Sequence, residues 1–379
     1  MQQKYDWGSF MDVKNVAVLG AGNGGMTAAA EFTERGFNVW LYELPDFAKN
    51  LEGIRQKGGF RLQEPNEEPP KDVFVPFTQV TSDIEEAVRD AQVIMLVVPG
   101  YAVDRFAEVL APVVREDQII FFNGAAAMGC VRFTRKARAL GITTSFKVCE
   151  ANSLSYGTRV YPDEARIELS LRVKKLFLAA YPKENTQECL EACIQLYPGL
   201  VAARDIWETT LENGNPEVHP GPCLLSAGHI EYCHGEFWLY REGITEHTIN
   251  VLHAIEKERM AIGRAFGFEL EDAVESRYRR GYFDNDKDDL QSLFNHSEVF
   301  TKIKGPTSIT SRYFTEDISD GLVLWSDLGR LAGVPTPNID AVITLGGSLL
   351  QIDFRKVGLT LDKLGYEDAT SINDLLKDV

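Results

Sequence analysis

The chain has 379 residues, with 39 Lys or Arg against 56 Asp or Glu, and a formal net charge of −17 at pH 7. This acidic balance argues against nucleic-acid or anionic-membrane partners, because both require clustered basic residues. Six cysteines, no apolar leader and no apolar run near the ~20 residues that span a bilayer favour a reduced, cytoplasmic protein. The length allows two or three domains of roughly 150 residues.

The first predicted elements are a strand, a glycine-rich turn, a helix and a second strand. Residues 15–19 form a short apolar run, residues 26–35 an alanine-rich helix pattern, and residues 37–42 a second apolar run. The turn carries G-x-G-x-x-G, which binds dinucleotides when a strand precedes it and a helix follows. The predicted cofactor contacts in this turn are Gly20, Gly22, Asn23, Gly24 and Gly25.

The glycines of the motif have separate physical roles in binding a pyrophosphate. Gly20 permits a tight turn, Gly22 lets the backbone approach the phosphates, and Gly25 lets the helix pack closely on the strand. The helix N-terminus offers unpaired N–H groups and the positive end of its dipole. Glu43, at the end of the second strand, would accept hydrogen bonds from ribose hydroxyls and repel a 2′-phosphate. We therefore expect NAD as the cofactor rather than NADP.

Strands and helices keep alternating to about residue 196. Helix patterns at 83–90, 101–114, 126–140 and 185–196 alternate with apolar runs at 91–98, 118–122 and 144–149. This order predicts a Rossmann-type, doubly wound parallel sheet, so we assign residues 1–206 to an NAD(P)-binding domain, of which residues 1–12 could be a flexible extension. Pro99 and Asn123 follow two of the strands, at the carboxyl edge where such sheets bind ligands, and are further cofactor candidates.

Residues 207–379 have the pattern of an all-helical domain. Apolar residues at helical spacing cover 245–266, 322–332 and 339–353. The predicted fold class is therefore α/β, with an N-terminal Rossmann-type sheet followed by an all-helical C-terminal domain. We expect the active site in the cleft between the domains, as in several two-domain dehydrogenases.

Two polar loops between the apolar helices of this half carry distinctive residues. The first has the pattern Asn-x-Asn-x-x-x-His-Pro from Asn213 to Pro220, and the second has Arg-Tyr-x-x-Glu-Asp from Arg312 to Asp317. Together with the opening G-x-G-N-G and a Glu…Tyr-x-x-Arg stretch within residues 150–159, these motifs make the chain resemble the octopine/opine dehydrogenase family over nearly its whole length.

The resemblance implies a reaction and the residues that perform it. Family members condense the amino group of an amino acid with the carbonyl of a 2-oxo acid, and hydride from NADH or NADPH reduces the resulting imine. By resemblance, His219 is the catalytic acid and base, Asp317 pairs with it, and Arg312 holds the 2-oxo acid carboxylate through a bidentate contact. Asn213 is assigned to positioning the substrate or the nicotinamide.

The amino-acid pocket is less well defined. Glu150, Tyr156 and Arg159 are candidates by resemblance, although a buried structural network explains them equally well. Trp238 and Tyr240 could wall the pocket or belong to the core. The expected partners are small-molecule substrates, with no nucleic acid and no membrane, and a homodimer is compatible with the sequence.

Other functions are open at this point. A 2-dehydropantoate reductase or a glycerol-3-phosphate dehydrogenase relative would need a catalytic lysine, and Lys257 is the one lysine between residues 207 and 282. A dinucleotide-binding sensor would need no catalytic residues at all.

Two further patterns, a set of His–Cys pairs and a cluster of arginines, are interpreted as structural rather than functional. The pairs His219–Cys223 and His229–Cys233 have metal-binding spacing, but we predict no metal site, because the reaction needs none. The cluster of Arg277, Arg279 and Arg280 is interpreted as a solvated face.

Overall fold

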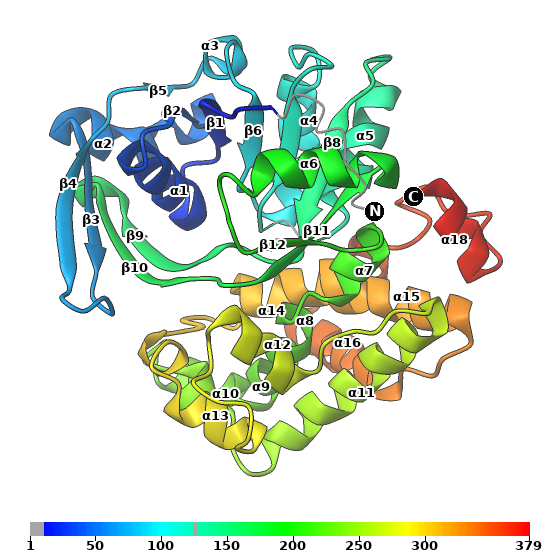
Figure 1. Ribbon diagram of the computed structural model, residues 1–379. Helices are drawn as coiled ribbons and strands as arrows, with labels where there is room; N and C mark the ends of the chain where they lie inside the picture. The colour runs from blue at the N-terminus through cyan, green and yellow to red at the C-terminus, as the bar shows by residue number, and fades with distance from the viewer. Residues whose placement is uncertain (1–10, 125–126) are drawn as a thin grey trace, which may run out of the picture. The chain divides into compact units, whose positions relative to one another are not determined.

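The computed structural model describes residues 11–124 and 127–379 (Figure 1). These residues group into two compact units. The first contains residues 11–124, 133–170 and 176–204, and the second contains residues 127–132, 171–175 and 205–379. Two short segments from the first half of the chain therefore belong to the second unit. Most of the extension expected at residues 1–12 lies outside the described residues.

The first unit is built on an eight-stranded sheet (Figure 1). Its strands in spatial order are β12 (Leu200–Ala202), β11 (Leu176–Tyr181), β8 (Lys147–Ala151), β7 (Ile119–Phe122), β6 (Val93–Leu96), β1 (Asn15–Leu19), β2 (Asn38–Tyr42) and β5 (Val80–Thr81). Neighbouring strands are parallel except for β11 and β8. The helices of the first half are α1 (Asn23–Glu34), α2 (Glu52–Lys57), α3 (Ile84–Val88), α4 (Val103–Leu110), α5 (Gly129–Ala139) and α6 (Thr186–Cys193).

The order of the strands determines where a ligand can bind. From β5 through β2, β1, β6 and β7 to β8, the sheet has the spatial order of the doubly wound dinucleotide-binding fold. The chain reverses its direction of travel across the sheet between β1 and β6, and ligands bind at the carboxyl ends of the strands beside such a switch point. The glycine motif follows β1 and Pro99 lies shortly after β6. The predicted Rossmann-type sheet is confirmed.

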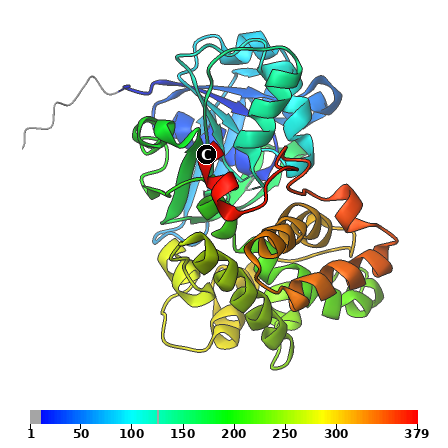
Figure 2. The same ribbon diagram turned by 90° about the vertical axis from the view of Figure 1, so that its right-hand side faces the viewer.

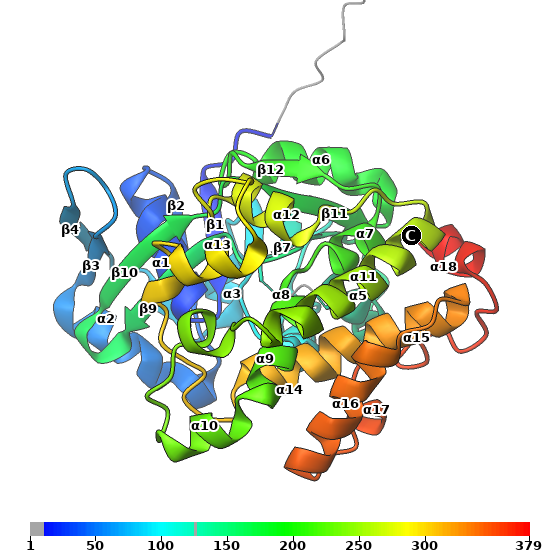
Figure 3. The same ribbon diagram turned by 90° about the horizontal axis from the view of Figure 1, so that it is seen from below.

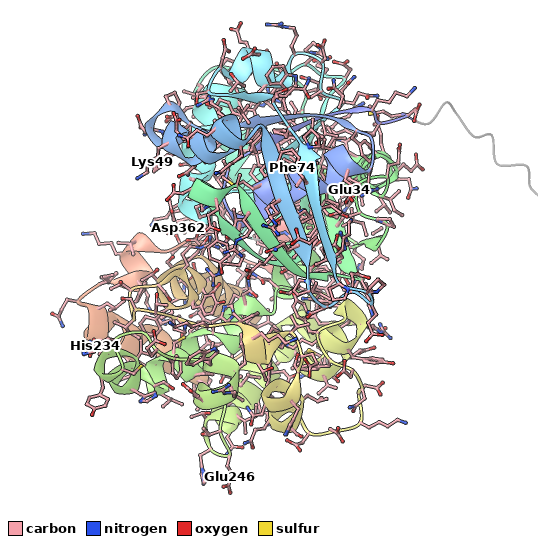
Figure 4. The ribbon with its side chains drawn as sticks, turned by 90° about the vertical axis from the view of Figure 1, so that its left-hand side faces the viewer. Glu34, Lys49, Phe74, His234, Glu246 and Asp362 are labelled. Atoms are coloured by element: carbon pink, nitrogen blue, oxygen red, sulfur yellow. The ribbon has the colours of Figure 1, made fainter. Side chains whose placement is uncertain are left out.

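The first unit also contains a four-stranded sheet that the sequence patterns did not predict. Its order is β4 (Lys71–Pro76), β3 (Gly59–Glu64), β10 (Arg166–Arg172) and β9 (Tyr156–Tyr161). The polar loop at residues 65–70 is the turn between β3 and β4. Lys71 of β4 makes a 2.6 Å ion pair with Glu34 at the end of α1; Glu34 is labelled in Figure 4. Because β3 pairs with the distant β10, local patterns do not reveal this sheet.

The second unit is helical, as predicted. Its helices are α7 (Ile206–Leu211), α8 (Asn215–Val218), α9 (Pro220–Leu225), α10 (Ala227–Tyr232), α11 (Thr248–Phe266), α12 (Ala273–Arg280), α13 (Leu290–His296), α14 (Arg312–Glu316), α15 (Val323–Ala332), α16 (Pro337–Leu350), α17 (Phe354–Val357) and α18 (Ile372–Asp378). Helix α11 packs on α9, α15 and α16 (Figure 3), and α15, α16 and α17 form the orange to red layer of Figure 2. Among the described residues, no helix is long and apolar enough to cross a membrane.

Buried ion pairs hold the short helix α8 within this unit. Glu217 is fully buried and accepts hydrogen bonds from Nε of Arg259 at 2.8 Å and from Nη1 of Arg277 at 3.2 Å. Arg259 also donates to the backbone carbonyls of Leu211 and Glu271. A buried charge is tolerated when it is paired and hydrogen-bonded, as here.

The solvated face predicted for Arg277, Arg279 and Arg280 is wrong for two of the three residues. Arg277 and Arg280 are each 5% exposed, and Arg280 donates to the backbone carbonyl of Glu212 at 2.8 Å. Their carboxylate partners lie about 60 positions earlier in the chain, which is why the local sequence suggested exposed charges.

Gly25→Ala should destabilise the first unit. A Cβ atom at this position would lie 1.8 Å from the backbone oxygen of Gly20, so the turn would have to move. Overpacking of this kind costs about 1–3 kcal/mol, and we expect the melting temperature to fall by about 5 °C. Gly22→Ala is the matched control, because a Cβ atom there meets nothing within 4 Å. Equal melting temperatures by circular dichroism would contradict this account.

A second prediction concerns the pH dependence of stability. Burial raises the pKa of Glu212 from 4.5 to about 7, although Arg259 and Arg280 oppose the shift. Between these two values the folded protein binds a proton that the unfolded chain has released, so the free energy of unfolding should decrease as the pH rises from about 4.5 to 7. The contribution is at most about 3 kcal/mol.

Glu212→Gln separates this contribution from the other titrating groups. The amide keeps an acceptor for the backbone N–H of Glu271, which the wild-type carboxylate accepts at 2.7 Å. Urea unfolding at pH 5 and pH 8 should therefore show a smaller loss of stability in the variant than in the wild-type protein. An equal loss of unfolding free energy between pH 5 and pH 8 in the two proteins would show that Glu212 does not cause the pH dependence.

Candidate active site

The glycine motif has the geometry of a phosphate-binding turn. Gly20 has φ = +102° and donates its N–H to the carbonyl of Tyr42 at 2.9 Å, which closes the turn on β2. Gly22 precedes the first residue of α1, and the space where its side chain would stand is open. Gly25 brings α1 against the backbone of Gly20. An anion could therefore approach the first N–H groups of α1 at Gly22.

Glu43 is hydrogen-bonded to the same turn. Its Oε2 accepts the backbone N–H of Ala21 at 2.8 Å, and its Oε1 accepts the N–H of Leu44 at the same distance. Burial raises the pKa of Glu43, while these hydrogen bonds act in the opposite direction. The carboxylate is thus fixed beside the glycine turn, at the end of β2.

Two of the predicted cofactor residues have side chains that are bonded within the first unit. Asn23 Oδ1 accepts the backbone N–H of Val160 on β9 at 2.9 Å, which ties the start of α1 to the smaller sheet. Asn123 is fully buried, and its side chain exchanges hydrogen bonds with Ser155. Gly24 contacts the region of Val97 and Leu154, where an added Cβ atom would clash with both side chains.

In the second unit, His219 has a partner on each ring nitrogen and on one ring face. Its Nδ1 lies 2.7 Å from Oδ2 of Asp317, and its Nε2 lies 2.8 Å from the hydroxyl oxygen of Tyr240. The ring of Tyr313 stacks on the imidazole with a centroid distance of 4.0 Å and an interplanar angle of 3°. His219 is 6% exposed. A carboxylate on Nδ1 fixes the tautomer and the orientation of the ring.

Asp317 is held at the point where α14 continues into a π-helical segment, Asp317–Leu322. Burial raises the pKa of Asp317, and its hydrogen bond with His219 opposes the shift. Tyr313 lies four positions before Asp317, so both side chains can face the same imidazole. The sequence reasoning missed Tyr313, although this i, i+4 spacing within the second motif could have indicated it.

Arg312 does not pair with Asp317. It begins α14, its side chain is 63% exposed, and its Nε contacts Oε2 of Glu316 one turn later. Asn213 is 9% exposed and accepts the backbone N–H of Asn215 at the start of α8, the short helix that ends just before His219. These residues come from the two predicted polar loops.

The three candidates for the amino-acid pocket belong to the first unit. Glu150 is fully buried on β8, and Tyr156 is 4% exposed on β9 with its ring edge against Tyr197. Arg159 is exposed on β9. Burial raises the pKa of Tyr156 well above its ordinary value, so its hydroxyl stays protonated.

The metal-binding alternative finds no support in the described part of the chain, where no group of three or more His, Cys, Asp or Glu could hold an ion. His219 binds Asp317 and Tyr240 instead of Cys223. His234, which follows His229 and Cys233, lies at the edge of the second unit (Figure 4).

Comparison with known proteins gives matches in both halves of the chain. Residues 15–125 match the family described as NAD-dependent glycerol-3-phosphate dehydrogenase N-terminus. Residues 202–350 match NAD/NADP octopine/nopaline dehydrogenase, alpha-helical domain.

A solved structure of octopine dehydrogenase with NADH and pyruvate has a TM-score of 0.72 at 18% identity, covering 96% of this chain and 98% of that one. A ketopantoate reductase from Ralstonia eutropha has a TM-score of 0.58 at 16% identity, covering 90% and 99%.

Full-length relatives give the more specific result. A vitopine synthase from Allorhizobium ampelinum is 26% identical, covering 94% of this chain and 97% of the relative. An opine dehydrogenase from Arthrobacter sp. (strain 1C) is 32% identical over 363 residues, which cover 95% of this chain and 98% of the relative. With this identity over nearly its full length, the chain belongs to the opine dehydrogenase family.

Proposed function

We propose that this protein is an NAD-dependent opine dehydrogenase. It condenses the amino group of an amino acid with the carbonyl of a 2-oxo acid such as pyruvate, reduces the imine to an N-(1-carboxyalkyl) amino acid, and catalyses the reverse oxidation. The observation that carries the proposal is the 2.7 Å contact between His219 and Asp317, which lie 98 positions apart in the two motifs of the resemblance.

In this proposal His219 and Asp317 move the protons of the reaction. Condensation releases water from the carbonyl carbon, so a proton must reach the departing oxygen near neutral pH, and histidine suits this task. Asp317 keeps the proton of Nδ1 in place, which leaves Nε2 as the nitrogen that gains and loses a proton.

Arg312 and Asn213 are assigned to binding and positioning. The guanidinium of Arg312 can hold a carboxylate through two parallel hydrogen bonds, and its present partner Glu316 is a carboxylate that the 2-oxo acid would replace. Asn213 lies two residues before the start of α8, close in sequence to His219, and would orient the substrate or the nicotinamide.

The first unit supports NAD binding through its glycine turn. Gly20, Gly22, Gly24, Gly25 and the N-terminus of α1 would hold the pyrophosphate, and Glu43 would accept hydrogen bonds from the ribose. NADH, when bound, supplies the hydride. The open space at Gly22 is the feature that fits this group, because any larger side chain would occupy it. Pro99 would contribute from the loop after β6. The side chains of Asn23 and Asn123 have protein partners, and the backbone N–H of Asn123 donates to Leu96, so Asn23 would act through its backbone and Asn123 through its carbonyl.

Several finer assignments stay predictions. We assign residues 1–206 to the NAD-binding domain and residues 207–379 to the substrate domain. Glu150, Tyr156 and Arg159 stay candidates for the amino-acid pocket. A cytoplasmic location suits the cysteines, all six of which are free thiols. A homodimer also stays a prediction.

The proposed reaction requires two organic substrates, and this requirement is its sharpest test. NADH oxidation, followed by absorbance, should occur with pyruvate or glyoxylate plus an amino acid, and not with either substrate alone. His219→Asn should bind NADH normally and lower kcat by about 10²–10⁴, the usual contribution of general acid–base catalysis. A full rate with the 2-oxo acid alone would contradict the proposal and indicate a simple 2-hydroxy acid dehydrogenase.

The choice of NADH over NADPH should depend on the charge of Glu43. Glu43→Gln keeps an oxygen for the N–H of Ala21 but removes the charge that would repel a 2′-phosphate. Removing a repulsion of about 1 kcal/mol or more should raise the ratio of kcat/KM for NADPH to that for NADH about tenfold. Asp46→Asn, an exposed site nearby in sequence, is the control. An unchanged ratio in Glu43→Gln would show that Glu43 does not read the ribose.

A further inference from the structure

His219 has no ring nitrogen left to offer directly to a substrate in this structure. Asp317 occupies Nδ1 and the hydroxyl of Tyr240 occupies Nε2, at 2.7 and 2.8 Å. If Nδ1 keeps its proton for Asp317, the exchangeable proton is the one on Nε2, and the group in contact with that nitrogen is the Tyr240 hydroxyl. A substrate must therefore displace this hydroxyl or exchange its proton through it.

The surroundings of Tyr240 argue against displacement. Its ring packs against Phe300 at 4.3 Å and Phe294 at 5.6 Å between centroids, and the residue is 3% exposed. Its backbone carbonyl accepts a hydrogen bond from Nδ2 of Asn295 at 2.7 Å. The residue lies in a π-helical segment, Leu239–Gly243, a rare geometry that is frequent at functional sites. These contacts hold the phenol in place beside the imidazole.

The hydroxyl is chemically suited to pass a proton on. Burial raises the pKa of Tyr240 well above its ordinary value, so the group is a neutral phenol. A phenol oxygen can accept a proton from Nε2–H while its own O–H donates one. Within the described residues, His219 is the one hydrogen-bond partner of this hydroxyl, which leaves its remaining capacity for a ligand.

We propose that the hydroxyl of Tyr240 relays the proton between Nε2 of His219 and the departing oxygen of the substrate. In the condensing direction the N–H bond of the imidazolium breaks as an O–H bond forms on Tyr240, and the original O–H bond of Tyr240 breaks as one forms on the substrate oxygen. One positive charge leaves the imidazole, water departs, and Tyr240 is neutral before and after. The relay rests on the proposed function and makes Tyr240 a catalytic residue.

Tyr240→Phe tests the relay, because it removes the oxygen and keeps the ring. We expect the single-turnover rate to fall about 100-fold, within the range of general acid–base effects, with unchanged NADH binding. Tyr282→Phe is the matched control, since Tyr282 stacks on the same Phe300 at 4.7 Å but has no contact with His219. A Tyr240→Phe rate within about threefold of wild type, with a normal melting temperature, would overturn the proposal.

The number of protons that move in the transition state gives a second measurement, which a change in packing alone would not alter. We expect a plot of the single-turnover rate against the fraction of D₂O in the solvent to be curved for the wild-type enzyme, because two protons move together. For Tyr240→Phe the plot should be linear. A straight or flat plot for wild type overturns the relay, even if the variant fails to fold. If His219→Asn abolishes turnover while Tyr240→Phe does not, the proposed function stands without the relay. A wild-type enzyme inactive with every substrate pair contradicts the function instead.

Discussion

A buried imidazole needs a hydrogen-bond partner on each nitrogen, and this constraint organises the helical unit. His219 is 6% exposed, and its two partners, Tyr240 and Asp317, lie 21 and 98 positions later in the chain. Each partner lies in a π-helical segment, Asp317–Leu322 or Leu239–Gly243. At Asp317 the π-helical turns join α14 to α15 without ending the helix, whereas the segment that carries Tyr240 stands alone between the extended residues Trp238 and Ile244. Helical irregularity is thus found at the two residues that must reach the ring.

The position of His219 depends in turn on buried charge. Helix α8 has four residues, Asn215–Val218, and a helix of that length has little stability of its own. Glu217, two positions before His219, is joined to Arg259 of α11 and Arg277 of α12. These pairs fasten α8 to two longer helices. Their loss would leave unpaired charge in the interior, so the position of His219 is tied to the stability of the unit.

The fold was predictable where its determinants are local. The apolar runs, the glycine turn and the helix that follows it specify the βαβ unit within residues 15–42. The smaller sheet was not predictable, because β3 pairs with β10 about 100 residues later. Arg277 looked solvated because Glu217 lies 60 positions away. The pairing of His219 with Asp317 came from resemblance, and the sequence left Tyr240 as either a pocket wall or a core residue, with no sign that its hydroxyl lies on Nε2 of His219.

In an acidic chain, a helix N-terminus can take an anion only if no carboxylate of the chain already occupies its free N–H groups. Helices α2, α3, α4 and α6 each have an acidic residue in their first turn, where it stabilises the helix dipole. The first turns of α1 and α5 have none, and the N-cap of α1 is Gly22, which has no side chain to bond the free N–H groups. Glu43, the nearby carboxylate, bonds to Ala21 and Leu44 instead. The N-terminus of α1 therefore keeps its capacity for a phosphate in a chain of net charge −17. The distribution of the acids, rather than their number, leaves this helix end open to an anion.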